Sequence, residues 1–176
     1  MSKAFTKDEA PEAPLLVRRR APLPDGVPNW VTRRGLELLR GERAALDGER
    51  VRLAAADPDD PERARRLAVT GARLADLDAR IASARVVDPT DQPPDDVRFG
   101  ATVTLRVTTH GGGEERRLTI VGVDEADPAR GRVAFVAPIA RAILGLRAGE
   151  VATLRTGRGD EELEVLAIAY EGSVAR

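Results

Sequence analysis

What the chain lacks excludes several kinds of chemistry. Its 176 residues include no cysteine and a single histidine, so we expect no disulfide, no thiolate metal ligand and no histidine-based metal site or catalytic triad. That histidine, His110, is followed by three glycines in an expected turn. No apolar run approaches the ~20 residues that span a bilayer, and the N-terminus lacks the apolar core of a signal peptide. We therefore expect a cytoplasmic protein with no membrane partner and no stable metal site of its own.

Charge is abundant but balanced. The chain has 28 Lys and Arg against 29 Asp and Glu, and charged residues make up 32% of it. Because the two signs nearly cancel, the composition gives no general reason to expect binding to nucleic acid or to a membrane surface.

Residues 32–87 carry the strongest pattern in the sequence. Large apolar residues recur every seven positions on two arms: Leu39, Leu46 and Leu53, then Leu67, Leu74 and Ile81. This period predicts two helices packed along a narrow seam, and the short stretch between them requires an antiparallel hairpin. Each arm of about 25 residues makes a rod of roughly 35 Å. The hairpin could lie flat on a larger body, but the polarity of its other positions favours a projecting arm.

The hairpin turns through an acidic segment that is the first candidate site. The segment reads Asp57-Pro58-Asp59-Asp60-Pro61-Glu62. The two prolines keep the arms from fusing into one helix. We expect Thr32 to cap the first helix, and Asp60 to cap the second with Pro61 at its first position. The ordinary role of these carboxylates is capping and solvation. The arginines that follow, Arg63, Arg65 and Arg66, could steer the tip toward RNA or simply form a solvated face.

Two proline-rich segments mark the domain limits. Residues 1–29 contain five prolines and few large apolar residues, so we expect a disordered tail. Residues 89–96 are a second segment rich in Pro and Asp. We therefore divide the chain into a tail (1–29), a hairpin (30–88), a linker (89–96) and a C-terminal domain (97–176), and we expect Trp30 to attach the hairpin base to that domain.

Beyond residue 97 the apolar period changes from seven to two, which predicts strands. We expect a β-hairpin turning at residues 110–113, a third strand at 132–136, a short helix at 138–144, and strands at about 150–156 and 161–170. The order β-β-β-α-β-β predicts a small antiparallel sheet around one helix, in an α+β fold.

Several stretches of the chain carry a family pattern. They are residues 1–7 with 22–29, residues 31–35, residues 99–103 with 120–125, and residues 137–145 with 148–151. The most specific reads Ala-Pro-Ile-Ala-Arg-Ala-Ile-Leu-Gly from Ala137 to Gly145. Together they resemble the GreA/GreB family of bacterial transcription elongation factors, the Gre transcript-cleavage factors, and the leader resembles that of GreB-type members.

The resemblance implies a fold, a partner and two sites. It implies an FKBP-like C-terminal domain that docks on RNA polymerase at the rim of the secondary channel, and a coiled coil that reaches toward the polymerase active site and, indirectly, the nascent RNA 3′ end. Such a protein is not an enzyme, acts as a monomer, and shares Mg²⁺ with the polymerase rather than holding a cofactor. The implied acidic site is Asp57, Asp59, Asp60 and Glu62. The implied polymerase-binding residues are Ala137, Pro138, Ile139 and Arg141.

The tip departs from the family pattern. The usual tip reads roughly Gly-Asp-x-Ser-Glu-Asn-Ala-x-Tyr, whereas this chain has no Ser, Asn or Tyr there, and each arm is shorter by about one heptad. Family members with several aspartates at the tip act as inhibitors, so a non-cleaving inhibitor or a competitor for the channel stays open. An FKBP-like domain could also be a peptidyl-prolyl isomerase, but only Phe99, Phe135 and Tyr170 are present to line a proline pocket.

Overall fold

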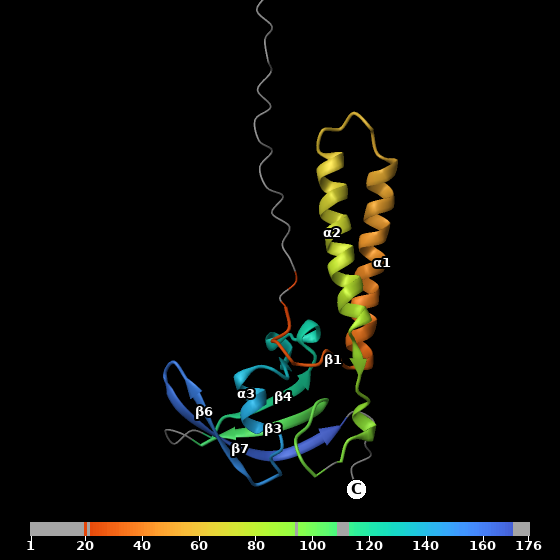
Figure 1. The fold of residues 1–176 in the computed structure, drawn as a ribbon. Helices are drawn as coiled ribbons and strands as arrows, with labels where there is room; N and C mark the ends of the chain where they lie inside the picture. Colours follow the sequence, from red (N-terminus) through yellow and green to blue (C-terminus); the bar gives the residue numbers. More distant parts are fainter. Residues whose placement is uncertain (1–19, 21, 94, 109–112, 171–176) are drawn as a thin grey trace, which may run out of the picture.

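The computed structural model describes residues 20, 22–93, 95–108 and 113–170. A two-helix hairpin stands on one end of a five-stranded sheet and projects away from it, with its turn at the far end (Figure 1). The projecting arm expected from the sequence is therefore present, and the fold class of helical hairpin plus C-terminal β domain is confirmed. None of the described helices is long and apolar enough to span a bilayer.

The hairpin consists of α1 (Arg33–Ala55) and α2 (Arg63–Ala82). Helix α1 has 23 residues, which at 1.5 Å per residue makes an arm of roughly 35 Å, as expected. Thr32 caps α1 as predicted, because its side-chain oxygen accepts the amide of Gly35 at 2.9 Å.

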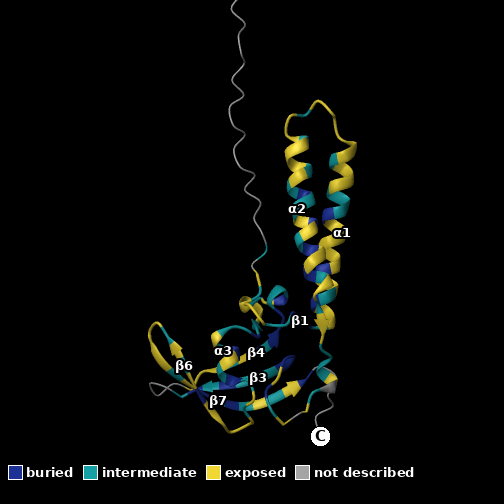
Figure 2. Ribbon diagram, viewed as in Figure 1, coloured by how far each residue is buried: buried dark blue, intermediate teal, exposed yellow. Residues whose placement is uncertain are grey.

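The seam between the helices is tight at the base and open toward the tip. Leu39, Leu46, Leu74 and Leu77 are buried, and together with Val31 they form a cluster separate from the core of the sheet. Closer to the turn, the heptad leucines are only half-buried, and exposed residues dominate (Figure 2). Arg43, which occupies a core-type position in the heptad, instead reaches Asp78 on the other helix at 2.6 Å. The hairpin is therefore held mainly at its base.

The C-terminal sheet has the order β5-β4-β3-β7-β6. Its strands are β3 (Ala101–Val107), β4 (Glu115–Val121), β5 (Arg132–Ala134), β6 (Val151–Thr156) and β7 (Gly159–Tyr170). Alternate residues of β3 point into the core, where Val103 and Leu105 are fully buried. Helix α3 (Pro138–Ile143) contributes the buried Ala140 and Ile143 to this core. The expected turn at residues 110–113 lies outside the described residues, apart from residue 113.

One strand pairing corrects the expectation of a wholly antiparallel sheet. Strand β5 pairs with β4 in parallel, so the sheet is mixed. The reason is the connection between them, which passes through two short 3-10 turns, η3 (Val123–Glu125) and η4 (Pro128–Arg130), and so brings Arg132 back level with Thr119 of β4. A direct hairpin turn would have reversed the strand direction instead.

The base of the hairpin contains a small ladder that the sequence did not predict. Strand β1 (Trp30–Val31) precedes α1 in the chain, strand β2 (Arg85–Val86) follows α2, and the two strands pair in parallel. Before them, the Asn29 side chain is buried and donates to the carbonyl of Arg80 at 2.8 Å and to Ser83 at 3.0 Å. The end of the expected tail thus belongs to the fold, whereas residues 1–19 lie outside the described part. The division at residues 89–96 stays a prediction.

Candidate functional site

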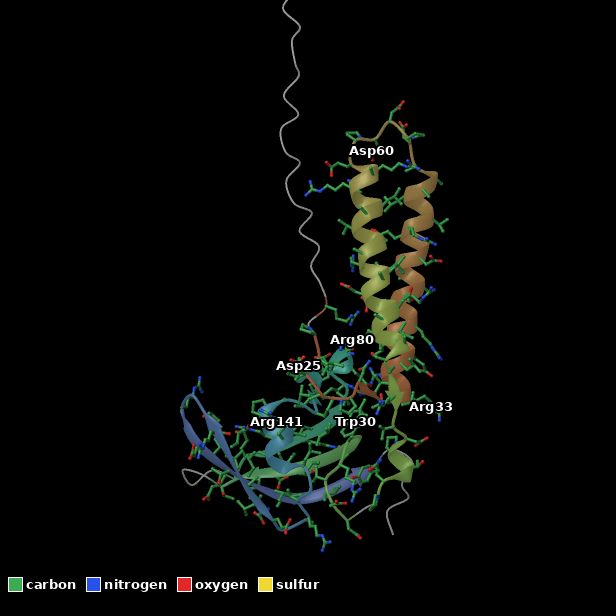
Figure 3. All side chains as sticks on the ribbon, viewed as in Figure 1. Asp25, Trp30, Arg33, Asp60, Arg80 and Arg141 are labelled. Carbon is green, nitrogen blue, oxygen red and sulfur yellow. The ribbon has the colours of Figure 1, made fainter. Side chains whose placement is uncertain are left out.

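Figure 3 shows Asp60 at the free end of the hairpin, in the acidic turn that also carries Asp57, Asp59 and Glu62. The expected cap is wrong in detail: α2 begins at Arg63, and its N-cap Glu62 makes no side-chain cap bond. Asp60 lies earlier and accepts the amide of Glu62 at 2.9 Å, while Asp57 accepts the amide of Asp59 at 2.9 Å. The cap differs because each aspartate side chain accepts the backbone amide two residues later, and this local turn competes with capping of the helix.

The four carboxylates consequently divide into two kinds. One oxygen of Asp57 and one of Asp60 hold the backbone of the turn. Asp59 and Glu62 are exposed, and within the described part of the chain their carboxylates accept no hydrogen bond. The two tip carboxylates with no role in holding the turn are therefore those of Asp59 and Glu62.

Arg63 fixes the end of the first helix. Its Nε donates to the carbonyl of Leu53 at 2.9 Å, and its Nη2 donates to that of Ala54 at 2.7 Å. These are among the last carbonyls of α1, which have no partner within the helix, and the positive guanidinium suits the negative end of the helix dipole. Arg63 is therefore a structural residue rather than a free cation. The carbonyl of Leu53 also accepts the amide of Ala56 at 3.3 Å, so Arg63 adds a second donor there and supplies the donor for Ala54.

Carboxylate oxygens are the donors that Mg²⁺ prefers, so the chemistry of the tip fits a shared magnesium ion. The geometry does not amount to a complete site: among the described residues, no group of three or more His, Cys, Asp or Glu is placed to hold a metal. The tip can thus supply one or two oxygen ligands to an ion whose remaining ligands come from elsewhere.

The second candidate site lies on α3. Ala137 is the N-cap and provides no side-chain cap, and Pro138 occupies the first helical position. Pro138 and Arg141 are exposed and lie one helical turn apart, so they share one face. Ile139 is half-buried and packs against the core. Of the four predicted residues, Pro138 and Arg141 are therefore the pair that a partner could contact directly.

Two acidic residues of η3 join the hairpin to the sheet. The buried Glu125 accepts hydrogen bonds from the hydroxyl of Thr32, at the start of α1, and from the guanidinium of Arg132 on β5. Asp124 accepts a hydrogen bond from Arg20 at 2.6 Å and lies 3.4 Å from Nε of Arg80 on α2. Both helices of the hairpin are thus tied to the same short turn.

The sequence analysis missed this junction, although a glycine signalled it. A Cβ at position 35 would lie 2.9 Å from an oxygen of Glu125, so Gly35 allows α1 to approach the carboxylate closely. A Cβ at position 122 would lie 2.7 Å from the carbonyl oxygen of Trp30. Both glycines therefore serve close packing between the hairpin base and the sheet.

The aromatic residues complete the junction. Trp30 packs on Phe99 and Phe135, with ring centroids 6.0 and 5.3 Å apart, which agrees with the expected attachment by Trp30. Tyr170 is buried, accepts the amide of Arg98 at 3.0 Å and donates to the carbonyl of Asp96 at 2.6 Å. The rings that a proline pocket would need are thus packed in the interior, which argues against the isomerase alternative.

Comparison with known proteins identifies relatives of this architecture. Residues 92–170 match the family model described as transcription elongation factor, GreA/GreB, C-term. A transcription elongation factor GreB of Neisseria meningitidis is 35% identical over 156 residues, covering 81% of this chain and 94% of the relative. A GreA of Nitratidesulfovibrio vulgaris is 33% identical over 144 residues, covering 78% and 88%. A solved GreA/GreB structure from Nitrosomonas europaea is 25% identical, covers 80% of this chain and 98% of that chain, and has a TM-score of 0.40.

Proposed function

This chain belongs to the GreA/GreB family of transcription elongation factors, and from that membership we propose that it binds RNA polymerase at the rim of the secondary channel. The hairpin then extends down the channel toward the polymerase active site. As a member of this family the protein is not itself an enzyme, because any RNA cleavage belongs to the polymerase. It works as a monomer in the cytoplasm, where its partner is found.

The single observation that carries the proposal is the position of the acidic turn. Its four carboxylates lie at the free end of an arm of roughly 35 Å, away from the domain that carries α3. An arm of this kind can enter a channel that a globular domain cannot. Arg141 lies in the C-terminal domain, far from the turn of the hairpin (Figure 3), and the exposed Pro138 lies one helical turn from it on α3, so a partner bound there would leave the arm free.

We further propose that the protein stimulates transcript cleavage weakly. Bound Mg²⁺ would supply Lewis-acid stabilisation of the reacting phosphate. The tip's contribution is to place carboxylate oxygens, and two of its four carboxylates each use one oxygen to hold the turn. A misplacement of about 1 Å already costs about 100-fold in rate, so a shorter arm without the Ser-Glu-Asn context is poorly suited to efficient cleavage.

A second function rests on the same geometry. A protein that docks at the rim and fills the channel excludes other factors, whether or not cleavage follows. Asp59 and Glu62 add two exposed negative charges to the tip. These charges favour a tip that attracts the active-site cation over one that holds the cation in a fixed position. A transcript-cleavage assay measured alongside polymerase binding distinguishes cleavage from exclusion.

Docking can be tested with charge reversals on one domain. We expect Pro138→Glu and Arg141→Glu to weaken binding of the full chain to RNA polymerase by about tenfold or more, since each places a carboxylate in the contact. The matched control is Arg155→Glu, an exposed arginine on β6 that makes the same change in net charge as Arg141→Glu. Circular dichroism would confirm that each variant is folded. Unchanged binding by both α3 variants would remove α3 from the docking surface.

A further inference from the structure

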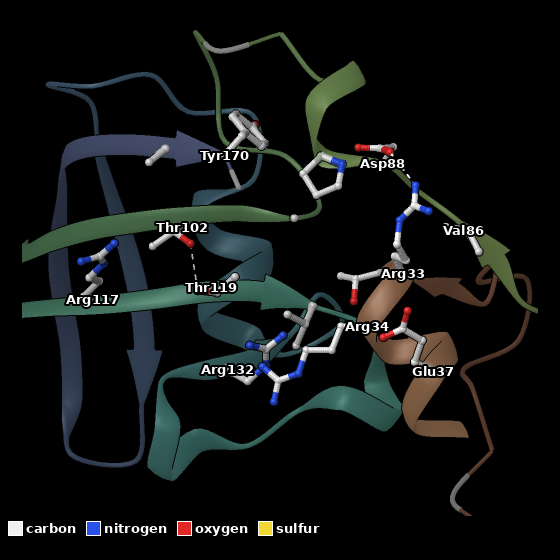
Figure 4. Close-up of a pocket in the computed structure, with 15 residues that line it drawn as sticks. Arg33, Arg34, Glu37, Val86, Asp88, Thr102, Arg117, Thr119, Arg132 and Tyr170 are labelled. Carbon is white, nitrogen blue, oxygen red and sulfur yellow. Dashed lines mark hydrogen bonds and ion pairs between the residues drawn. The ribbon is translucent and has the colours of Figure 1, made fainter. Parts of the chain in front are cut away.

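A cleft of about 540 Å³ lies between the start of α1 and the outer face of the sheet. Four arginines line it: Arg33 and Arg34 come from the hairpin, and Arg117 and Arg132 come from the sheet, with Arg117 farther along the strands from the hairpin than Arg132 (Figure 4). Neither the acidic tip nor α3 contributes to it. The cleft is therefore separate from both sites on which the proposed function depends.

The cations of this cleft outnumber its acids. Four arginines line it against two carboxylates, those of Glu37 and Asp88. Arg33 lies 3.4 Å from Asp88, an exposed pair that contributes little. Arg34 and Arg117 are both exposed, and no ion pair involves either of them in the part of the chain that the structure describes. Two guanidinium groups on opposite walls are thus available to a ligand.

The helix start adds to this positive potential. The N-terminal end of a helix carries a partial positive charge, so acidic residues are favoured in its first turn. Helix α1 has none there and begins with Arg33 and Arg34 instead. An anion in the cleft would offset this unfavourable arrangement, and the helix would help to bind it.

Polar groups on the sheet side of the cleft are a second observation. The Nη2 of Arg132 pairs with Glu125, but its Nε is buried and has no hydrogen-bond partner among the described residues. A buried donor without an acceptor is costly, and such groups call for an explanation. Beside it, the hydroxyls of Thr102 and Thr119 share one hydrogen bond at 2.9 Å, which leaves one of the two hydrogens for another acceptor. The Arg132 Nε is too deeply buried for a ligand in the cleft to reach, so the donor that this wall offers besides charge is a threonine hydroxyl.

We propose that this cleft binds a small phosphate-bearing ligand of the pyrophosphate or nucleoside polyphosphate class. Its volume falls within the range of about 300 to 1,000 Å³ that is usual for small-molecule sites. Arginine is suited to phosphate because its planar fork of donors matches two phosphate oxygens at once. Several arginines on facing walls fit a ligand with more than one phosphate. A small ligand is favoured over nucleic acid because the chain as a whole has a net charge of −1 and lacks a general attraction for polyanions.

Because α1 and the sheet form different walls, the ligand would bridge the hairpin base and the C-terminal domain. Binding at such a bridge stabilises the folded protein by an amount that grows with the logarithm of the ligand concentration above Kd.

Isothermal titration calorimetry of the full chain with sodium pyrophosphate, and separately with adenosine triphosphate, tests the site. The pocket variant is Arg34→Ala/Arg117→Ala, which removes two exposed side chains without an ion pair and so should leave folding intact. The matched control is Arg155→Ala/Arg158→Ala, which removes two exposed arginines of the β6–β7 hairpin and makes the same change in net charge. A melting curve of each variant without ligand shows that it is folded.

We expect saturable binding of one ligand per chain, weakened about tenfold or more in the pocket variant and unchanged in the control. We also expect the ligand to raise the melting temperature of the wild type but not that of the pocket variant. Absence of saturable binding, or an equal loss in both variants, would overturn the proposal. So would single-stranded RNA that binds through the same arginines more tightly than pyrophosphate does, because that result would assign the cleft to nucleic acid. No polymerase is present, so either outcome is independent of the proposed function.

Discussion

Replacing Glu125 by Ala should loosen the hairpin from the sheet. The carboxylate is buried, with its side chain only 1% exposed, and it accepts from both Thr32 on α1 and Arg132 on β5. Its removal leaves the largely buried guanidinium of Arg132 without a counter-charge and takes one hydrogen bond from the residue that caps α1. Breaking a buried pair in this way costs about 3 to 5 kcal/mol of unfolding free energy.

Urea unfolding followed by circular dichroism would measure this cost, and a double-mutant cycle would locate it. If Glu125 acts partly through the cap, Glu125→Ala and Thr32→Ala should couple by about 0.5 to 3 kcal/mol. The control is Asp78→Ala, which removes the acid of an exposed ion pair across the hairpin and should change stability little. A loss for Glu125→Ala no larger than that for the control, or additive effects in the cycle, would refute the view that this carboxylate joins the two parts.

Three further changes test other parts of the structure. Arg63→Ala removes two hydrogen bonds to the last carbonyls of α1, and we expect urea unfolding to show a loss of about 1 to 2 kcal/mol, whereas Arg63→Lys should restore only part of it. Gly35→Ala should lower the free energy of unfolding, because the added Cβ would lie 2.9 Å from an oxygen of Glu125. Gly41→Ala, whose Cβ would meet nothing within 4 Å, should raise it by about 0.5 to 1 kcal/mol. A Gly35→Ala variant more stable than Gly41→Ala would contradict the close approach of α1 to Glu125. Burial raises the pKa of Tyr170 above 10.0, so the contribution of this residue to stability is present below pH 10 and should be lost as the pH rises through the raised pKa. In a titration of unfolding free energy against pH, Tyr170→Phe should abolish this part of the alkaline loss.

The sequence predicted the features that depend on local pattern. The seven-residue period located both helices, Thr32 was recognised as a cap, and the two-residue period located the strands. Each depends on residues that are neighbours along one helix or strand, where side-chain spacing reports structure directly.

The features that the sequence did not reveal depend on contacts between distant segments. Arg63 was expected either to steer the tip toward RNA or to belong to a solvated face, because its contact with the carbonyls of α1 forms only once the turn is closed. Asp124 and Glu125 belonged to a motif that matched the family but gave no sign of contacting Thr32, which lies 93 positions before Glu125. The parallel pairing of β5 likewise follows from the path of a connection rather than from the pattern of the strand.

Transcript cleavage on a backtracked elongation complex, measured alongside polymerase binding, tests the central claim most directly. Wild type should bind the polymerase but stimulate cleavage much less than a GreB factor with the Ser-Glu-Asn tip. Any residual cleavage should be lost in Asp59→Asn/Glu62→Gln, which removes the two free carboxylates while sparing the turn, and binding should be unchanged. Vigorous cleavage by the wild type that this double variant abolishes would contradict the weak-cleavage account, and failure of the wild type to bind the polymerase would contradict the proposed function as a whole.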